Sequence, residues 1–177
     1  MTLAQQILDL DRDFMRSQFS LLDSQCELVG KYLSEDFENE GDSPIVEDWE
    51  FLHAIGFVTA QKYLSVSCRV LRMEKQKHKA YALGPRVNSE ISCAAVVNAA
   101  ANHWKHSSEW DFGNLSEDAK RTISTLNKAA VEVPEHGGYV ASKVFEKLGL
   151  NKFGDLTPIL KQWGEDVEKA FPDETLS

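Results

Sequence analysis

The chain has 177 residues, enough for one domain that buries a hydrophobic core without disulfide or metal support. Its hydrophobic fraction of 42% and charged fraction of 27% are those of a globular protein and exclude an intrinsically disordered chain. A formal net charge of −9 excludes a surface that attracts nucleic acid everywhere, although it leaves room for a local basic patch.

The cysteines and the N-terminal residues indicate the cellular compartment in which the protein is expected. Cys26, Cys68 and Cys93 are odd in number and form no CxxC pair, so we expect small buried side chains in a reducing compartment rather than a zinc site. The first residues show no secretion signal, and no stretch approaches the roughly 20 apolar residues that a membrane span needs. These features predict a cytoplasmic protein without a membrane partner.

The first half of the chain predicts two long helices. Apolar residues recur at helical spacing from residue 3 to the mid-thirties and indicate an amphipathic helix. They form two neighbouring sets, which are Leu3, Ile7, Leu10, Phe14, Leu21 and Leu28, and then Leu22, Cys26, Val29 and Leu33. After an acidic loop, Ser43 and Pro44 mark the start of a second helix over 44–76. Gly56 lies on its apolar face, where a small residue allows another element to approach closely.

A third helix is expected from about Arg86 to about His106, after the break at Gly84 and Pro85. Its centre is rich in Ala and Val, which is typical of a helix that neighbours cover on several sides. Asn114 has capping spacing and opens a fourth helix that ends near Val131.

Two shorter helices are expected at about 139–148 and 157–171, between breaks at Gly and Pro residues. We find no alternating strand pattern and no internal repeat. The sequence therefore predicts an all-α fold, a helical bundle of about four major helices plus one or two short ones. No flexible linker divides the chain, so we expect one domain over 1–177.

Polar residues interrupt the third helix between residues 98 and 110. On a helix their spacing places one set on a single face, namely Asn98, Asn102, Lys105, His106 and Glu109. Buried polar groups are unfavourable unless they are satisfied, so this stripe at the end of an apolar helix needs an explanation.

One explanation is a catalytic or binding site. His106 is the candidate general base or acid, because imidazole is suited to proton transfer near neutral pH. Glu109 would orient His106 or pair with Lys105, while Lys105 and Asn102 would hold an anionic group. Trp104 or Trp110 would stack on a base or wall the pocket. The alternatives are a polar network that fixes helix packing, with Lys105 and Glu109 as a surface pair, and a partner interface.

The same segment resembles the distal part of the HEPN superfamily motif, in which an Arg and a polar residue such as Asn precede a His near a helix end. Asn102 and His106 match the Asn and the His at the expected spacing. The resemblance implies a helical bundle that often dimerises and cleaves RNA without a metal, frequently in toxin–antitoxin or anti-phage systems. Ala101 stands where that motif has Arg, so a catalytic member would need its phosphate-stabilising charge from elsewhere.

A basic cluster offers that charge. It consists of Arg69, Arg72, Lys75, Lys77, His78 and Lys79. Cations are favoured at a helix C-terminus, so a solvated helix end is one interpretation. The other is a phosphate-binding patch in which Arg69, Arg72 and Arg86 contact the substrate.

The Glu50–His53 pair has the Glu-x-x-His spacing of half a di-iron site, but no second copy exists, so we expect no metal and no cofactor. The preferred hypothesis is a HEPN-like protein that cleaves or binds RNA, with RNA and a second copy of the chain as partners. The alternative is a non-enzymatic module whose acidic surface binds a protein partner.

Overall fold

The computed structural model describes residues 3–36, 44–135 and 138–172. Its helices are α1 (Leu3–Asp36), α2 (Pro44–Val70), α3 (Lys77–Tyr81), α4 (Cys93–His106), α5 (Glu117–Lys128), α6 (Val140–Lys147) and α7 (Leu156–Ala170). Three 3₁₀ turns join some of them, namely η1 (Glu74–Gln76), η2 (Ser107–Glu109) and η3 (Phe153–Asp155). Within these residues no strand forms, apart from one isolated bridge between Arg86 and Ser92, and the predicted all-α fold class is confirmed.

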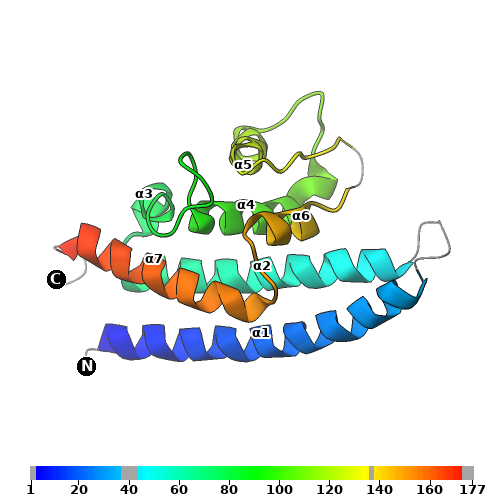
Figure 1. The fold of residues 1–177 in the computed structure, drawn as a ribbon. Helices are drawn as coiled ribbons and strands as arrows, with labels where there is room; N and C mark the ends of the chain where they lie inside the picture. Colours follow the sequence, from blue (N-terminus) through cyan, green and yellow to red (C-terminus); the bar gives the residue numbers. More distant parts are fainter. Residues whose placement is uncertain (1–2, 37–43, 136–137, 173–177) are drawn as a thin grey trace.

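Helix α2 is the centre of the arrangement. It runs antiparallel to α1 on one side and packs against α4 and α6 on the other, while α7 crosses the same region (Figure 1). Helix α5 packs on α4 and lies at the edge of the molecule opposite to α1 (Figure 1). The two edges of this layered bundle are therefore formed by α1 and by α5.

The two apolar sets of α1 have different environments. The inward side, which packs on α2, carries Leu8, Met15 and Phe19, all buried, with Leu22 and Cys26 partly buried against the core. The set that begins at Leu3 and ends at Leu28 lies instead on the surface. A helix of this length carries two apolar seams on nearly opposite sides, and only one of them can face α2.

Two contacts fix the elements around α2. A side chain at Gly56 would place its Cβ 2.1 Å from the Phe153 ring, so the glycine permits the close approach of η3. The buried carboxylate of Glu50 accepts hydrogen bonds from the backbone N–H groups of Ala141 at 2.6 Å and Ser142 at 2.9 Å. Because these groups open α6, Glu50 satisfies N–H donors that the helix itself leaves unpaired.

Four predicted helix boundaries differ from the structure, and one of them is the end of α5, which lies at Lys128 rather than near Val131. Helix α2 ends at Val70 rather than near residue 76, since Arg72 adopts a φ of 57° that a helix cannot continue. The third helix begins at Cys93 rather than near Arg86, because the intervening residues form a turn and Ser92 provides the cap, accepting from the Ala95 N–H at 3.2 Å.

Helix α5 begins at Glu117, with Ser116 rather than Asn114 as its cap. Pro44 is the first residue of α2, as expected, while Ser43 lies outside the described residues. The predicted limits of α1, α6 and α7 agree with the structure to within a residue or two. In the three described ranges, none of the helices combines the length and apolar character required to cross a bilayer.

Candidate functional site

One face of α4 forms the floor of a cleft of about 850 Å³. Helix α3 and the turn that follows it make one wall, and α5 makes the other. The polar and charged lining residues are Lys77, His78, Tyr81, Arg86, Glu90, Ser92, Asn98, Asn102, His106, Glu109, Ser116, Asp118, Arg121, Thr122 and Thr125. Its volume is in the range of ligand-binding pockets, and its lining is more polar than most of them.

The sequence of α4 explains this floor. Ala95, Asn98, Ala99, Asn102 and His106 follow one another at spacings of three, one, three and four, so they share one face of the helix. The two alanines keep the floor open because their side chains are short. The two asparagines and the histidine then place polar groups at successive turns along the cleft.

Gln61 of α2 orients the two asparagines. Its Nε2 donates to Asn98 Oδ1 at 2.9 Å and to Asn102 Oδ1 at 2.7 Å, and its Oε1 accepts from Lys105 Nζ at 2.7 Å. With each Asn Oδ1 engaged, the side-chain Nδ2 groups are the donors that remain for a ligand. The polar network that fixes helix packing, which the sequence offered as an alternative to a site, is therefore present. The same network leaves two amide donors facing the floor of the cleft.

His106, Glu109 and Trp110 lie together at one end of the cleft. His106 Nδ1 is 3.5 Å from Glu109 Oε2, and both side chains are more than half exposed. Glu109 thus lies beside His106 rather than beside Lys105, which bonds to Gln61. The indole of Trp110 is half-buried and packs edge-on against the ring of His103, with centroids 5.4 Å apart.

Basic side chains reach the cleft from three elements. Lys77 and His78 come from α3, Arg86 from the turn before α4, and Arg121 from α5. Arg86 is held in place because its Nη2 donates to the Ser89 carbonyl oxygen at 2.9 Å. These groups stand beside carboxylates, since Glu90 and Asp118 also line the cleft and Asp118 lies 3.2 Å from Arg121.

Four of the residues that the sequence suggested lie outside this lining. Arg69 and Arg72 are exposed near the end of α2. Lys105 is engaged with Gln61 on the flank of α4, and its partial burial lowers the pKa of the amine. Trp104 packs edge-on against Phe51, with ring centroids 5.8 Å apart. The cleft instead includes Lys77, His78 and Arg86, and it adds Arg121, which the sequence analysis missed.

The position of Ala101 explains why the chain carries no arginine there. Ala101 is fully buried, on the side of α4 that packs into the core. An arginine at this point would require a buried guanidinium without a partner, which is strongly unfavourable. Any cation that serves a phosphate in the cleft therefore comes from another element.

The Glu50–His53 pair has a structural role. Glu50 caps α6, and His53 is buried with its Nδ1 2.7 Å from the Trp49 carbonyl oxygen and its ring packed edge-on against Phe145. Burial lowers the pKa of His53 and favours the neutral ring. Among the residues that the structure describes, no group of three or more His, Cys, Asp or Glu side chains is placed to hold a metal ion.

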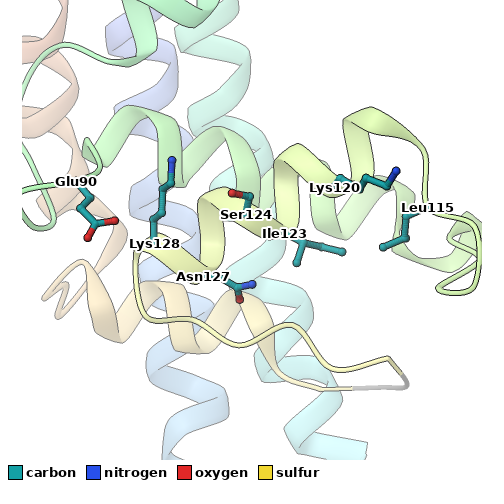
Figure 2. Close-up of a pocket in the computed structure, with 7 residues that line it drawn as sticks. All are labelled: Glu90, Leu115, Lys120, Ile123, Ser124, Asn127 and Lys128. Carbon is teal, nitrogen blue, oxygen red and sulfur yellow. The ribbon is translucent and has the colours of Figure 1, made fainter.

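A second hollow of about 480 Å³ lies along another side of α5. Its lining consists of Glu90, Leu115, Lys120, Ile123, Ser124, Asn127 and Lys128 (Figure 2). Glu90 belongs to both hollows, so the second one adjoins the cleft and adds two lysines to its surroundings. Lys120 is already paired with Glu117 at 2.9 Å.

We compared the chain with protein-family models, with curated proteins and with solved structures, and none of them matches. The interpretation of the cleft consequently depends on its own residues and geometry.

Proposed function

We propose that the cleft between α3, α4 and α5 binds single-stranded RNA, in the manner of a HEPN-like protein. One observation carries this proposal: cations from three elements, two amide donors and an indole share one concave surface. Phosphates are recognised by Arg, Lys and Asn donors, and unpaired bases stack on aromatic rings. The cleft offers both kinds of contact.

The overall charge of −9 does not oppose this function. Steering of a polyanion depends on the local field, and acidic surfaces elsewhere limit binding to the cleft. Glu90, Glu109 and Asp118 weaken the field inside it, so we expect moderate affinity rather than tight binding. A structured duplex is a poor ligand, because its bases cannot reach Trp110.

The same geometry suits metal-independent cleavage. A base at His106 would take the proton of a ribose 2′-hydroxyl, whose oxygen attacks the adjacent phosphorus. The bond to the departing 5′-oxygen breaks, and solvent at the open end of the cleft returns a proton to that oxygen. The products are a 2′,3′-cyclic phosphate and a 5′-hydroxyl, without any redox partner. Arg121, which enters the cleft from α5, would stabilise the extra negative charge on the phosphoryl oxygens.

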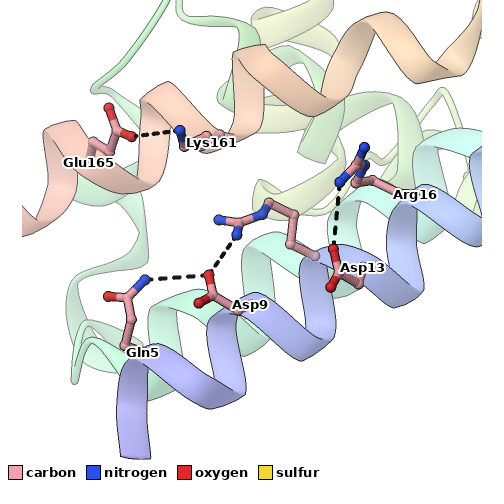
Figure 3. A network of polar contacts seen from close by, with 7 residues as sticks. Gln5, Asp9, Asp13, Arg16, Lys161 and Glu165 are labelled. Carbon is pink, nitrogen blue, oxygen red and sulfur yellow. Dashed lines mark hydrogen bonds and ion pairs between the residues drawn. The ribbon is translucent and has the colours of Figure 1, made fainter. Parts of the chain in front are cut away.

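Binding is tested by fluorescence anisotropy of a labelled oligouridylate at several salt concentrations. For three cationic contacts we expect log K to fall with log salt at a slope of about −2, because each contact contributes roughly −0.7. Arg121→Glu should weaken binding at least about tenfold and flatten the slope. Lys161→Glu is the matched control, since Lys161 also forms an exposed ion pair within its helix, with Glu165 of α7 at 3.5 Å (Figure 3).

Equal losses in both variants, or no measurable binding of the wild type at low salt, would refute the RNA-binding proposal. Cleavage is assayed separately, in EDTA, with mass analysis of the product ends. We expect cyclic-phosphate ends that are lost in His106→Ala and absent with 2′-deoxy substrate. If RNA binds to the cleft but remains intact, the protein is an RNA-binding member without the catalytic step.

A further inference from the structure

The outer face of α1 carries a strip of exposed apolar side chains, which Ser17 and Ser24 interrupt. Their exposed fractions are Leu3 72%, Ile7 39%, Leu10 73%, Phe14 51%, Leu21 62% and Leu28 48%. Surface leucines that occur singly need no explanation, but six aligned on one helix do. We call these six side chains the outer strip.

The outer strip has the period of a coiled-coil seam. Its members, together with Ser17 and Ser24, follow one another at spacings that alternate between four and three residues. This is the 3.5-residue period at which a straight helix meets another helix over many turns. The residues that pack on α2 repeat with the same period from Leu8 but on nearly the opposite side of α1. The outer strip is therefore a second helix-packing face with no helix of this chain on it among the described residues.

The size of the outer strip fits a protein interface. The six exposed fractions together equal about three and a half fully exposed residues. At roughly 150–200 Å² for each large side chain, the strip presents on the order of 500–700 Å² of apolar surface. The largest apolar patch on a monomer is typically about 300–600 Å², and a stable interface takes about 800 Å² from each partner. With its polar flanks, the strip reaches that size.

We propose that the outer strip pairs with the same strip of a second copy of this chain, with the two α1 helices antiparallel. Superposing the strips end to end brings Leu3 opposite Leu28 of the other copy and Leu10 opposite Leu21. The remaining layers place Phe14 opposite Ser17 and Ile7 opposite Ser24. Every layer thus combines two leucines or one large and one small residue, which is how packed layers interdigitate. In this register the two serines of the seam leave room for the larger Phe14 and Ile7 side chains of the other copy.

Charge along the two flanks agrees with this pairing. When two identical helices pair antiparallel, the same flank of the strip in each copy faces the other. On the flank that carries Gln6, Asp13, Ser20 and Glu27, Asp13 therefore faces Ser20 of the other copy and Glu27 faces Gln6. No two carboxylates meet on that flank, although like charges at such positions would be destabilising. Asp13 is moreover balanced by Arg16 at 3.6 Å within its own helix, and Asp9 by Arg12 at 2.6 Å (Figure 3). The strip therefore meets its copy without repulsion despite the acidic chain.

This inference is independent of RNA binding. Because α1 and α5 form opposite edges of the molecule, the dimer carries one complete cleft on each outer side (Figure 1). Neither cleft borrows a residue from the partner, and loss of the dimer leaves each cleft intact. An anionic membrane is a poor alternative occupant, since Asp13 and Glu27 flank the strip and a membrane-surface helix is typically flanked by cations.

The test is analytical ultracentrifugation of the full chain between about 1 and 100 µM. We expect a dimer for the wild type and a monomer for the double variant Leu10→Glu/Leu21→Glu, with unchanged circular dichroism. Tyr139→Glu is the matched control, because Tyr139 is 41% exposed but lies far along the chain, just before α6, and it should remain dimeric. A monomeric wild type, or a dimer that survives the double substitution, would overturn the proposal.

Orientation is tested by spin labels at Gln6→Cys in a Cys26→Ala background. Along the helix axes of the antiparallel register Gln6 is level with residue 25 of the other copy, so the two labels are about 28 Å apart at 1.5 Å per residue. A parallel pair would bring them within roughly 15 Å and contradict the register. Protein that is monomeric alone but sediments with neutral phosphatidylcholine vesicles would assign the strip to a membrane and also reject the dimer.

Discussion

Two helix faces in this protein differ in polarity and in surroundings. The outer strip of α1 is apolar and lies on the surface, whereas the face of α4 from Asn98 to His106 is polar and lies in a cleft. Each departs from the simple rule that apolar residues are buried and polar residues are exposed. Spacing identifies the members of a face, but only the packing of other elements decides what covers it.

The two faces also differ in how they are supported. The polar face of α4 is held by Gln61 of α2, which fixes both asparagines through hydrogen bonds of 2.7–2.9 Å. Among the residues that the structure describes, the outer strip has no comparable polar support, apart from Lys62, whose Nζ lies 4.9 Å from the centre of the Phe14 ring. A prearranged face suits a ligand, and an unsupported apolar face suits another helix.

The largest difference in stability is expected between substitutions on the inner and the outer side of α1. Phe19→Ala removes a fully buried aromatic ring and should lower the free energy of unfolding by about 3–5 kcal/mol. Leu21→Ala removes a side chain that is 62% exposed and should change the stability of the monomer by less than about 0.5 kcal/mol. Urea unfolding at a concentration below dimer formation measures both, and similar losses would contradict the division of α1 into an inner and an outer side.

The next effect concerns α2, which positions both faces. Gly56→Ala forces a Cβ into the ring of Phe153, and neither the backbone nor the packed ring can yield easily. We expect a loss of about 2–3 kcal/mol in the free energy of unfolding. The control is Gly164→Ala in α7, where a Cβ meets no atom within 4 Å and should be neutral or stabilising by up to about 1 kcal/mol. Equal tolerance of both substitutions would show that η3 does not pack closely on α2.

A smaller effect concerns His103 of α4, whose ring is packed against Trp110. Burial lowers the pKa of His103 to about 4, below the ordinary value of 6.5. Between pH 6.5 and 4 the unfolded chain therefore binds a proton that the folded chain does not. We expect the free energy of unfolding to be constant above pH 7 and to fall by about 1–3 kcal/mol as the pH drops through that window.

Unfolding curves at pH 7.5, 6 and 5 measure this dependence. His103→Gln should make it shallower, and the buried His53 accounts for part of what remains, because its pKa is lowered as well. Ser108→Ala is the control, because Ser108 is exposed just beyond the end of the same helix and neither side chain titrates in this range, so it should leave the pH dependence unchanged. If His103→Gln left it unchanged too, His103 would not be buried in solution.

Much of the fold could be predicted from the sequence. Helical periodicity gave α1, and breaks at Gly and Pro residues gave α6 and α7, all with limits accurate to a residue or two, while Pro44 marked the start of α2. The end of α2 and the start of α4 were wrong, because Arg72 and the turn before Ser92 depend on local backbone geometry that periodicity does not encode. The buried or exposed state of the Leu3 strip was equally beyond reach, since α1 carries two apolar seams.

The candidate site was predictable only in part. Helical spacing grouped Asn98, Asn102 and His106 correctly, because all three belong to one helix. It could not find Gln61 or Arg121, which approach from other helices through tertiary packing. Charge alone suggested Arg69 and Arg72 as well as Arg86, yet only Arg86 lies in the cleft. Even within α4, Lys105 and Trp104 lie outside the cleft, because their side chains pack against Gln61 and Phe51 of α2.

We propose that RNA binds in the cleft of α4 and not on the outer strip of α1. Hydrogen exchange of the full chain, with and without a saturating oligouridylate, tests it most directly. We expect slower exchange in α3, at the C-terminal half of α4 and at the start of α5, with α1 unchanged. Slower exchange confined to α1, or no change in the cleft under conditions where RNA is bound, would contradict the account.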